Sequence, residues 1–333
     1  MSGPCRHPWT LALFTAAALV ACVAPGGERQ GAPAADAQPR AAAGATPVRA
    51  VSITVDDLPA TQSRSLAEMS RITRELLGGF ARFGVVATGF VNETKLDDVP
   101  GEESARAALL EAWLAAGHDL GNHTYSHLRF YDASLADMQA DVVRGERVTR
   151  ELMERRGGRP RYVRHPTLNT GRTLRAKEAF EGFLADHGYA VAPVTIDNDE
   201  YLYAAAYARA AARGDTAAML RLGADYVRYM EEIFDFYERL SGEVLGREPA
   251  QVLLLHANAL NADHAEPLLR MIQRRGYRFV TLEAALEDAA YRLPDRYVGA
   301  RGPSWIQRWA ITRGQEPGVQ PPVPEWVSAA ARP

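Results

Sequence analysis

The chain has 333 residues, with 38 Lys or Arg and 41 Asp or Glu, so its formal net charge is -3. Charges of both signs are intermixed, which gives no argument for a nucleic acid partner. The two cysteines, Cys5 and Cys22, both lie within the first 22 residues. The remainder of the chain therefore has no disulfide and no thiolate ligand, so any metal must be held by histidine and carboxylate.

The N-terminus is typical of an export signal. Arg6 and His7 precede an apolar stretch, 9–20, that is too short to persist as a membrane-spanning anchor. It ends in Leu-Val-Ala-Cys, which resembles the lipobox of bacterial lipoproteins, so we expect residues 1–21 to be a signal peptide and Cys22 to carry the lipid. The alternative is an ordinary secretory signal cleaved at a later small residue. Val23 indicates the outer membrane, so we expect a lipid-anchored envelope protein facing the periplasm.

Three further regions follow. Residues 22–48 are rich in Ala, Pro, Gly and Gln and cannot bury enough apolar surface to fold, so we expect a flexible tether. Residues 49–291 have the length of one α/β barrel domain. Residues 292–333 place three tryptophans among prolines, which favours an irregular C-terminal tail packed on the barrel.

Within the domain, strand and helix signals alternate, which predicts a parallel sheet in an α/β barrel or a doubly wound fold. The strand-like runs are 51–56, 85–91, 118–121, 161–164, 189–196, 251–255 and 277–280. The helix-like runs are 64–82, 103–116, 134–156, 173–187, 264–275 and 282–290. The stretch 201–245 exceeds a normal crossover, so we expect an inserted helical pair whose tyrosines are mainly core residues.

Residues that can bind a metal or transfer a proton lie at the end of the first of these strands. Asp56 and Asp57 end the β-branched run 51–56, where neighbouring side chains point to opposite sides, so one can bind a metal while the other addresses a water. His123 and His127 are four residues apart and would share one face of a helical turn. Two imidazoles and one carboxylate form a known type of metal site with open positions. Each motif alone also has a structural explanation, as a helix cap or a chance pair.

Two later strands end in the same way. Arg164 follows a short apolar run, and His256 ends the apolar run 252–255. In a parallel barrel the carboxyl ends of the strands meet where active sites are built. A lone histidine at a strand end is often a core residue whose hydrogen bonds are satisfied. Here four groups follow in chain order, namely the Asp pair, the His pair, Arg164 and His256, and together they favour an active site.

These residues resemble the polysaccharide deacetylase family, also called the NodB-homology or carbohydrate esterase family 4 fold. Its motif T-F-D-D-G is matched at 54–58, H-[ST]-x-x-H at 123–127, R-x-P at 164–166 and L-x-H at 254–256. A weaker acidic motif before Trp corresponds to 197–201. The resemblance covers about residues 51–290 and implies an α/β fold, a single distorted (β/α) barrel of the NodB-homology type.

The resemblance implies a role for each residue. Asp56 would be the general base, and Arg164 would orient it and hold it ionised by lowering its pKa. Asp57, His123 and His127 would hold a divalent metal, with Zn²⁺ the expected ion. His256 would be the general acid. A carboxylate among 197–200 would tune His256; Asp197 is the named candidate, and Asp199 and Glu200 remain alternatives.

The departures from the family concern the substrate groove. Leu58 replaces the Gly of the first motif, and Thr167-Leu168 replaces the usual Tyr-Gly after R-x-P. In the family this last region lines the groove and lends a backbone N–H to the oxyanion. The groove residues we expect are His165, Pro166, Thr167, Leu254 and Tyr201. The substrate is therefore expected to differ from a standard one.

Three functions remain open. The first is a metal-dependent deacetylase acting on an N-acetylated or O-acetylated glycan at the cell envelope. The second is a related C–N hydrolase of a small non-sugar amide. The third is a catalytically silent, envelope-binding lipoprotein. An aromatic-lined cleft would favour the glycan, and a pocket lidded by 201–245 would favour the small amide.

Overall fold

The computed structural model describes residues 49–61, 63 and 65–332, so the expected signal peptide, Cys22 and tether lie outside the described residues. Its strands are β1 (Arg49–Leu58), β2 (Thr88–Val91), β3 (Asp119–Asn122), β4 (Tyr162–Val163), β5 (Ala190–Val191), β6 (Gln251–His256) and β7 (Tyr277–Phe279). Its α-helices are α1 (Leu66–Phe83), α2 (Thr94–Asp97), α3 (Glu103–Ala115), α4 (Leu135–Arg144), α5 (Arg147–Glu154), α6 (Leu174–Asp186), α7 (Glu200–Ala212), α8 (Thr216–Leu245), α9 (Ala259–Arg274), α10 (Leu282–Leu286), α11 (Trp305–Thr312) and α12 (Glu325–Ala331). Two 3₁₀ turns, η1 (Pro166–Leu168) and η2 (Ala289–Arg292), complete them. Among these described helices, none has both the length and the apolar character to cross a membrane.

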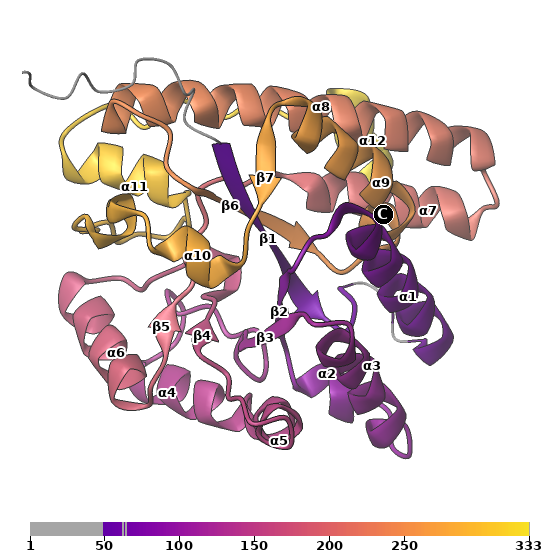
Figure 1. Ribbon diagram of the computed structural model, residues 1–333, viewed down its shortest axis with the longest axis horizontal. Helices are drawn as coiled ribbons and strands as arrows, with labels where there is room; N and C mark the ends of the chain where they lie inside the picture. Colours follow the sequence, from indigo (N-terminus) through magenta and orange to yellow (C-terminus); the bar gives the residue numbers. More distant parts are fainter. Residues whose placement is uncertain (1–48, 62, 64, 333) are drawn as a thin grey trace, which may run out of the picture. The chain divides into compact units, whose positions relative to one another are not determined.

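The strands form one parallel sheet in the order β5-β4-β3-β2-β1-β6, and β7 pairs with the first residues of β1. Beyond β5, Ile196 forms a bridge with Leu253 of β6, so the sheet curls back on itself. Figure 1 shows the strands in the middle of the domain with helices around them. The predicted distorted (β/α) barrel is thus confirmed, and its strands end at a common rim.

β1 pairs with three other strands, β2, β6 and β7, and it is buried on both faces. Every residue from Ala50 to Leu58 is buried. Ser52 and Thr54 alternate with Val51, Ile53 and Val55, and the polar residues are as fully buried as the apolar ones. Asp56 and Asp57 extend that run into the rim, so two carboxylates are buried at the end of a core strand.

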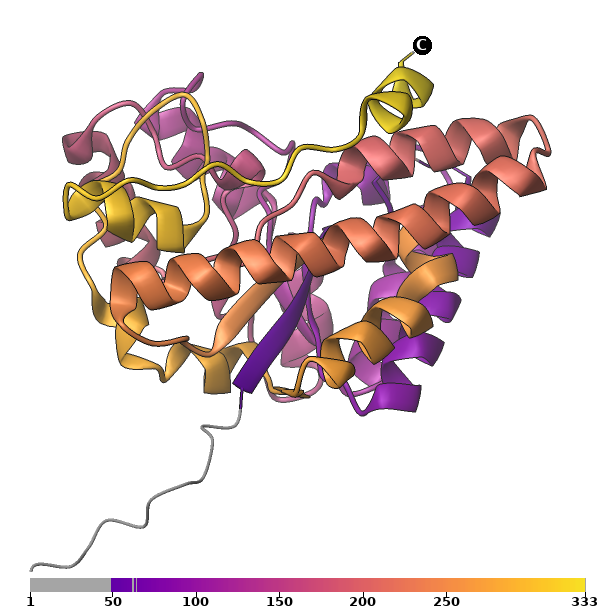
Figure 2. The same ribbon diagram turned by 90° about the horizontal axis from the view of Figure 1, so that it is seen from above.

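The expected helical pair is present as α7 and α8, which pack against each other and against α9 and lie side by side in Figure 2. The aromatic residues of α8 face the core: Tyr226, Tyr229, Phe234 and Tyr237 are all buried. Tyr201, at the start of α7, is 51% exposed instead. The insertion therefore contributes core to the domain and one exposed aromatic ring near the rim.

Two local expectations were wrong. The predicted helix over 134–156 is two helices, because α4 ends at Gly145. A Cβ at this glycine would lie 2.4 Å from the backbone nitrogen of Tyr125, so the chain passes too closely there for any side chain. The C-terminal tail is not wholly irregular, because α11 and α12 form within it, and Ser304 and Gln307 make a capping box at the start of α11.

Candidate active site

The ends of β1, β3 and β6 and the segments after β4 and β5 border one cavity of ≈ 430 Å³. Asp56, Asp57, His123, His127 and His256 all line it. β1 and β6 are hydrogen-bonded neighbours, and Asp56 is the register partner of His256. Five residues that lie up to 200 positions apart in sequence are thus gathered at one rim by the parallel pairing.

Asp56 and Asp57 both face this cavity, although neighbouring residues of a regular strand point to opposite sides. The pairing of β1 with β2 is irregular between Val55 and Leu58, and Asp57 has a left-handed φ of 70°. A bulge of this kind turns a side chain to the other face. The expected alternation of a regular strand was therefore wrong here: the irregularity at Asp57 lets both carboxylates line the cavity.

His123 and His127 lie in the loop after β3 and not on a helix, so the expected helical spacing was wrong. Thr124 and His127 have φ values of 63° and 58°, and these left-handed residues fold the loop back so that the two rings approach to 4.9 Å. The His127 Nε2 and Asp57 Oδ1 atoms are 3.7 Å apart, and His123 Nε2 lies 3.8 Å from the same oxygen. One ligand atom from each of the three residues lies within 4.8 Å of the others, so they could hold a metal ion.

Hydrogen bonding and charge leave these three residues in the form that a metal requires. His123 Nδ1 is 2.8 Å from the carbonyl oxygen of Arg164, which can only accept, so Nδ1 carries the proton and Nε2 keeps its lone pair. Burial lowers the pKa of both histidines, which keeps their rings neutral. Burial acts to raise the pKa of Asp57, but Lys95 and the two histidines outweigh it and hold that pKa well below its usual range. Neutral imidazoles and an ionised carboxylate suit Zn²⁺.

Lys95, which no sequence motif indicated, is the cation closest to this cluster among the ion pairs of the described residues. Its Nζ donates to the backbone oxygen of Asp57 at 3.0 Å and lies 3.4 Å from Oδ1 of the same residue. The side chain comes from the short helix α2, directly after β2. It ties down the strained backbone of Asp57 and balances part of the carboxylate charge.

Asp56 is paired with the fully buried Arg164. Arg164 Nη1 lies 3.3 Å and 3.4 Å from the two carboxylate oxygens, and Arg164 also donates to Thr54 Oγ1 and to the carbonyl of Ala192. The predicted orienting contact is therefore present. Arg164 acts to lower the pKa of Asp56, as expected, but burial outweighs it and raises that pKa to about 6. Desolvation of a carboxylate inside a core outweighs one long ion pair here.

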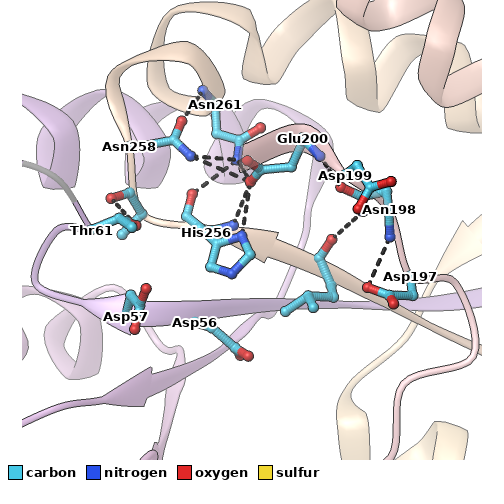
Figure 3. Close-up of polar contacts among 12 residues, drawn as sticks. Asp56, Asp57, Thr61, Asp197, Asn198, Asp199, Glu200, His256, Asn258 and Asn261 are labelled. Carbon is cyan, nitrogen blue, oxygen red and sulfur yellow. Dashed lines mark hydrogen bonds and ion pairs between the residues drawn. The ribbon is translucent and has the colours of Figure 1, made fainter. Parts of the chain in front are cut away.

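His256 is held by Glu200, and not by Asp197, the named candidate. Glu200 Oε1 accepts from the backbone N–H of His256 at 2.9 Å and lies 3.1 Å from its Nδ1. Asp197 instead accepts the backbone N–H of Asn198 at 2.9 Å (Figure 3). Burial lowers the pKa of His256, but Glu200 and the nearby aspartates outweigh it and raise that pKa to about 9. The ring is thus protonated at neutral pH.

Glu200 itself is held by two asparagines that follow His256. Asn261 Nδ2 donates to Glu200 Oε1 at 2.7 Å and to the carbonyl of His256 at 2.9 Å. Asn258 Nδ2 lies 3.3 Å from both carboxylate oxygens. Tyr226, on α8, donates to Asn261 Oδ1 at 2.6 Å. These asparagines orient the buried carboxylate.

The expected groove residues divide into two sets. Thr167, Leu254 and Tyr201 line the cavity as predicted. His165 and Pro166 do not, because both are buried beneath the loop. The ring of His165 packs at 5.4 Å from that of Phe180, and neither ring nitrogen has a hydrogen-bond partner. The middle residue of the R-x-P segment therefore faces the core rather than a substrate.

A family model described as polysaccharide deacetylase matches residues 43–184. This segment carries Asp56, Asp57, His123, His127 and Arg164 and ends before Glu200 and His256. No curated protein sequence matches the chain.

Similar solved structures include a peptidoglycan deacetylase from Bacillus subtilis (17% identity, TM-score 0.45, covering 72% of this chain and 91% of that one). A family 4 carbohydrate esterase from Streptomyces lividans is 18% identical, with a TM-score of 0.43 over 71% of this chain and 95% of that one. A CE4 family pseudoenzyme from Bacillus anthracis is 12% identical, with a TM-score of 0.45 over 72% of this chain and 65% of that one.

Proposed function

We propose that this chain is a member of the polysaccharide deacetylase family, whose model matches residues 43–184, and that it is a metal-dependent hydrolase that removes acetyl groups from an N-acetylated glycan. One observation carries the proposal. A carboxylate with a pKa raised to about 6 and an imidazole with a pKa raised to about 9 face one cavity. At neutral pH the first is mainly ionised and the second mainly protonated, as a general base and a general acid must be.

Asp57, His123 and His127 would hold the metal, for which Zn²⁺ fits the donor set. A divalent ion at this position supplies a Lewis acid for the acetyl carbonyl and makes a nearby water more acidic. The Arg164 carbonyl fixes the tautomer of His123, which leaves Nε2 as the nitrogen that would bind the metal. Lys95 keeps Asp57 in position.

The protein groups then move the protons. Asp56 takes a proton from the attacking water, and Arg164 holds its carboxylate in place through two contacts of 3.3 Å and 3.4 Å. His256 gives its proton to the leaving nitrogen, and Glu200 keeps the ring charged until that step. Each acid or base step of this kind typically contributes about 10²–10⁴-fold to the rate. The leaving amine departs neutral instead of as an unstable anion.

The rim favours a sugar over a small amide. Tyr201 is half exposed beside the cavity, where an aromatic face can stack on a sugar ring. Among the described residues that line the cavity, it alone comes from α7 or α8. The helical insertion thus contributes a single residue to the described cavity lining, whereas a lid would contribute many.

Acetate release tests the proposal. The purified protein is stripped with a chelator, reloaded with Zn²⁺ and offered N-acetylglucosamine oligomers, peptidoglycan and acetylated xylan. We expect release from an N-acetylated glycan that depends on metal and is lost in Asp56→Asn. Zinc-loaded, folded protein that releases acetate from none of the three would contradict the proposal.

We also propose that the protein acts at the cell envelope, anchored through a lipid on Cys22. The proposal is supported by the sequence of residues 6–22, in which basic residues precede an apolar stretch and Cys22 follows it. Lipid labelling of the expressed full-length chain tests this: wild type should incorporate the label, and Cys22→Ala should not. Equal labelling of the two would exclude this anchor.

A further inference from the structure

A segment near the C-terminus, residues 297–308, packs against the loop 166–171 that forms one wall of the cavity. Thr167 and Leu168 of the loop and Gly302 of the segment all line the cavity. The two stretches are more than 120 residues apart in sequence. The family match ends at residue 184, so the segment lies outside it. We refer to residues 297–308 as the clamp segment.

The loop is hydrogen-bonded to the backbone of the clamp segment. Asn169 Nδ2 donates to the carbonyl of Gly299 at 2.8 Å, and the backbone N–H of Gly299 donates to the carbonyl of Gly171 at 3.3 Å. Thr170 Oγ1 donates to the carbonyl of Tyr297 at 3.4 Å. These bonds use main-chain groups on the clamp side, so they fix the position of the backbone itself.

Arg308, on α11, is the central contact. Its side chain is fully buried, and its guanidinium donates to the carbonyl of Leu168 and to Thr170 Oγ1, the latter at 3.0 Å. It also donates to the carbonyl of Pro303 at 2.8 Å and lies 3.3 Å from Asp295 Oδ2. One buried cation thus binds the loop and the clamp segment together with charge-assisted hydrogen bonds.

The loop needs such support because of its backbone conformation. Thr167 and Leu168 have φ values of 54° and 53°, in the left-handed region that L-residues rarely adopt. Two such residues in succession persist only where the surroundings hold them. Gly302 fits against them without a side chain: a Cβ there would lie 2.0 Å from the Thr167 oxygen and 2.7 Å from the Leu168 carbonyl carbon.

We propose that the clamp segment is a working part of the active site. It holds Thr167 and Leu168 in the conformation that shapes the substrate wall, with Arg308 and Gly302 as positioning residues. The effect on turnover rests on the proposed deacetylase function, but the effect on the loop does not. The metal ligands come from β1 and the loop after β3, so zinc binding should be independent of the clamp.

Two variants of the full-length, zinc-loaded protein test this. Arg308→Met removes the donors to Leu168 and Thr170, and Gly302→Ala pushes a methyl group into the loop backbone. Arg313→Met is the control for the first, because Arg313 follows α11 and donates to the carbonyl of Val244 on α8. Gly242→Ala is the control for the second, because a Cβ there meets nothing within 4 Å. The readouts are hydrogen exchange of 166–171, zinc affinity, and kcat and KM for acetate release.

Both clamp variants should exchange the loop amides about tenfold faster, because local opening becomes easier, with zinc affinity unchanged. Their kcat/KM should fall by about 10²-fold, as misplaced site groups typically cause, and Arg308→Lys should recover part of it. Both controls should match wild type. If the loop exchanges at the wild-type rate in Gly302→Ala and in any folded Arg308 variant, the clamp segment does not hold the loop. If the loop exchanges faster but kcat/KM is unchanged, the clamp segment has no role in turnover. A wild type that releases no acetate would refute the proposed function, while the exchange data still decide whether the clamp exists.

Discussion

Replacing Glu200 with glutamine removes one negative charge beside His256 and nearly preserves the shape of the side chain. Glu200 Oε1 receives the short contacts, from His256 and from Asn261 at 2.7 Å, and an amide oxygen can accept these as well. The other oxygen has only a 3.3 Å contact with Asn258, so the new amide NH₂ loses little there. Glu200→Gln therefore tests the charge rather than the packing.

The expected change in rate follows from the pKa of His256. Burial favours the neutral ring, and Glu200 is the largest of the opposing interactions that raise the pKa to about 9. Without that charge the pKa should fall to its ordinary value of 6.5 or below. At pH 8 the protonated fraction would drop from about 90% to about 3%, a loss of about 30-fold in the active form.

The direction of this pKa change shows that activity should be measured as a function of rising pH. A general acid works only while it holds its proton, so activity should decline as pH rises through its pKa. We expect the alkaline limb of the kcat/KM profile near pH 9 in wild type and near or below pH 6.5 in Glu200→Gln. NMR titration of the His256 ring should give the same two values. Both proteins carry the same metal, so the difference between them reports Glu200.

Asp197→Asn is the matched control, because Asp197 also lines the cavity but bonds to Asn198 and not to His256. Its alkaline limb should stay within a few tenths of a pH unit of wild type. If Asp197→Asn moves the alkaline limb and Glu200→Gln leaves it in place, Glu200 is not the group that raises the pKa of His256.

Three further changes have definite outcomes. Asp56→Asn should lower kcat by at least about 10²-fold, the contribution of a general base, while equilibrium dialysis finds zinc still bound. His127→Ala removes one of three metal ligands, so both zinc binding and acetate release should be lost; full zinc occupancy would exclude this ligand set. Gly145→Ala should cost about 1–3 kcal/mol of unfolding free energy in urea, because its Cβ would press on the backbone of Tyr125; wild-type stability would show that the close approach is not real.

The strand ends were predictable because burial and β-branching leave a clear pattern. Asp56, Asp57 and His256 each close an apolar run, and parallel pairing then forces such ends to one rim. The helical pair was also predictable, because the stretch 201–245 is longer than a normal crossover between strands, and α7 and α8 occupy most of it. These features depend on local sequence, so the sequence alone indicates them.

Other features of the site depend on backbone turns and on how deeply a residue is buried. The sequence could not indicate these. The spacing of His123 and His127 fits a helix as well as a folded loop, and only the left-handed residues decide between them. The choice between Asp197 and Glu200 depends on which residue begins α7 and so turns toward His256. The raised pKa of Asp56 depends on its complete burial, which requires helices and strands from the whole chain.

The pairing of β1 with β6 also bears on how the protein is made. It joins residues 200 positions apart, Val51 with Gln251 through to Asp56 with His256, and contacts so distant in sequence form late and slowly. A nascent chain that has been synthesised only to residue 184 already contains the proposed metal ligands and the proposed base, but the proposed acid, His256, is still missing. Such a chain has the residues to capture zinc and lacks the means to complete a reaction. Under the proposed function, turnover therefore requires the last third of the polypeptide to have closed onto its first strand.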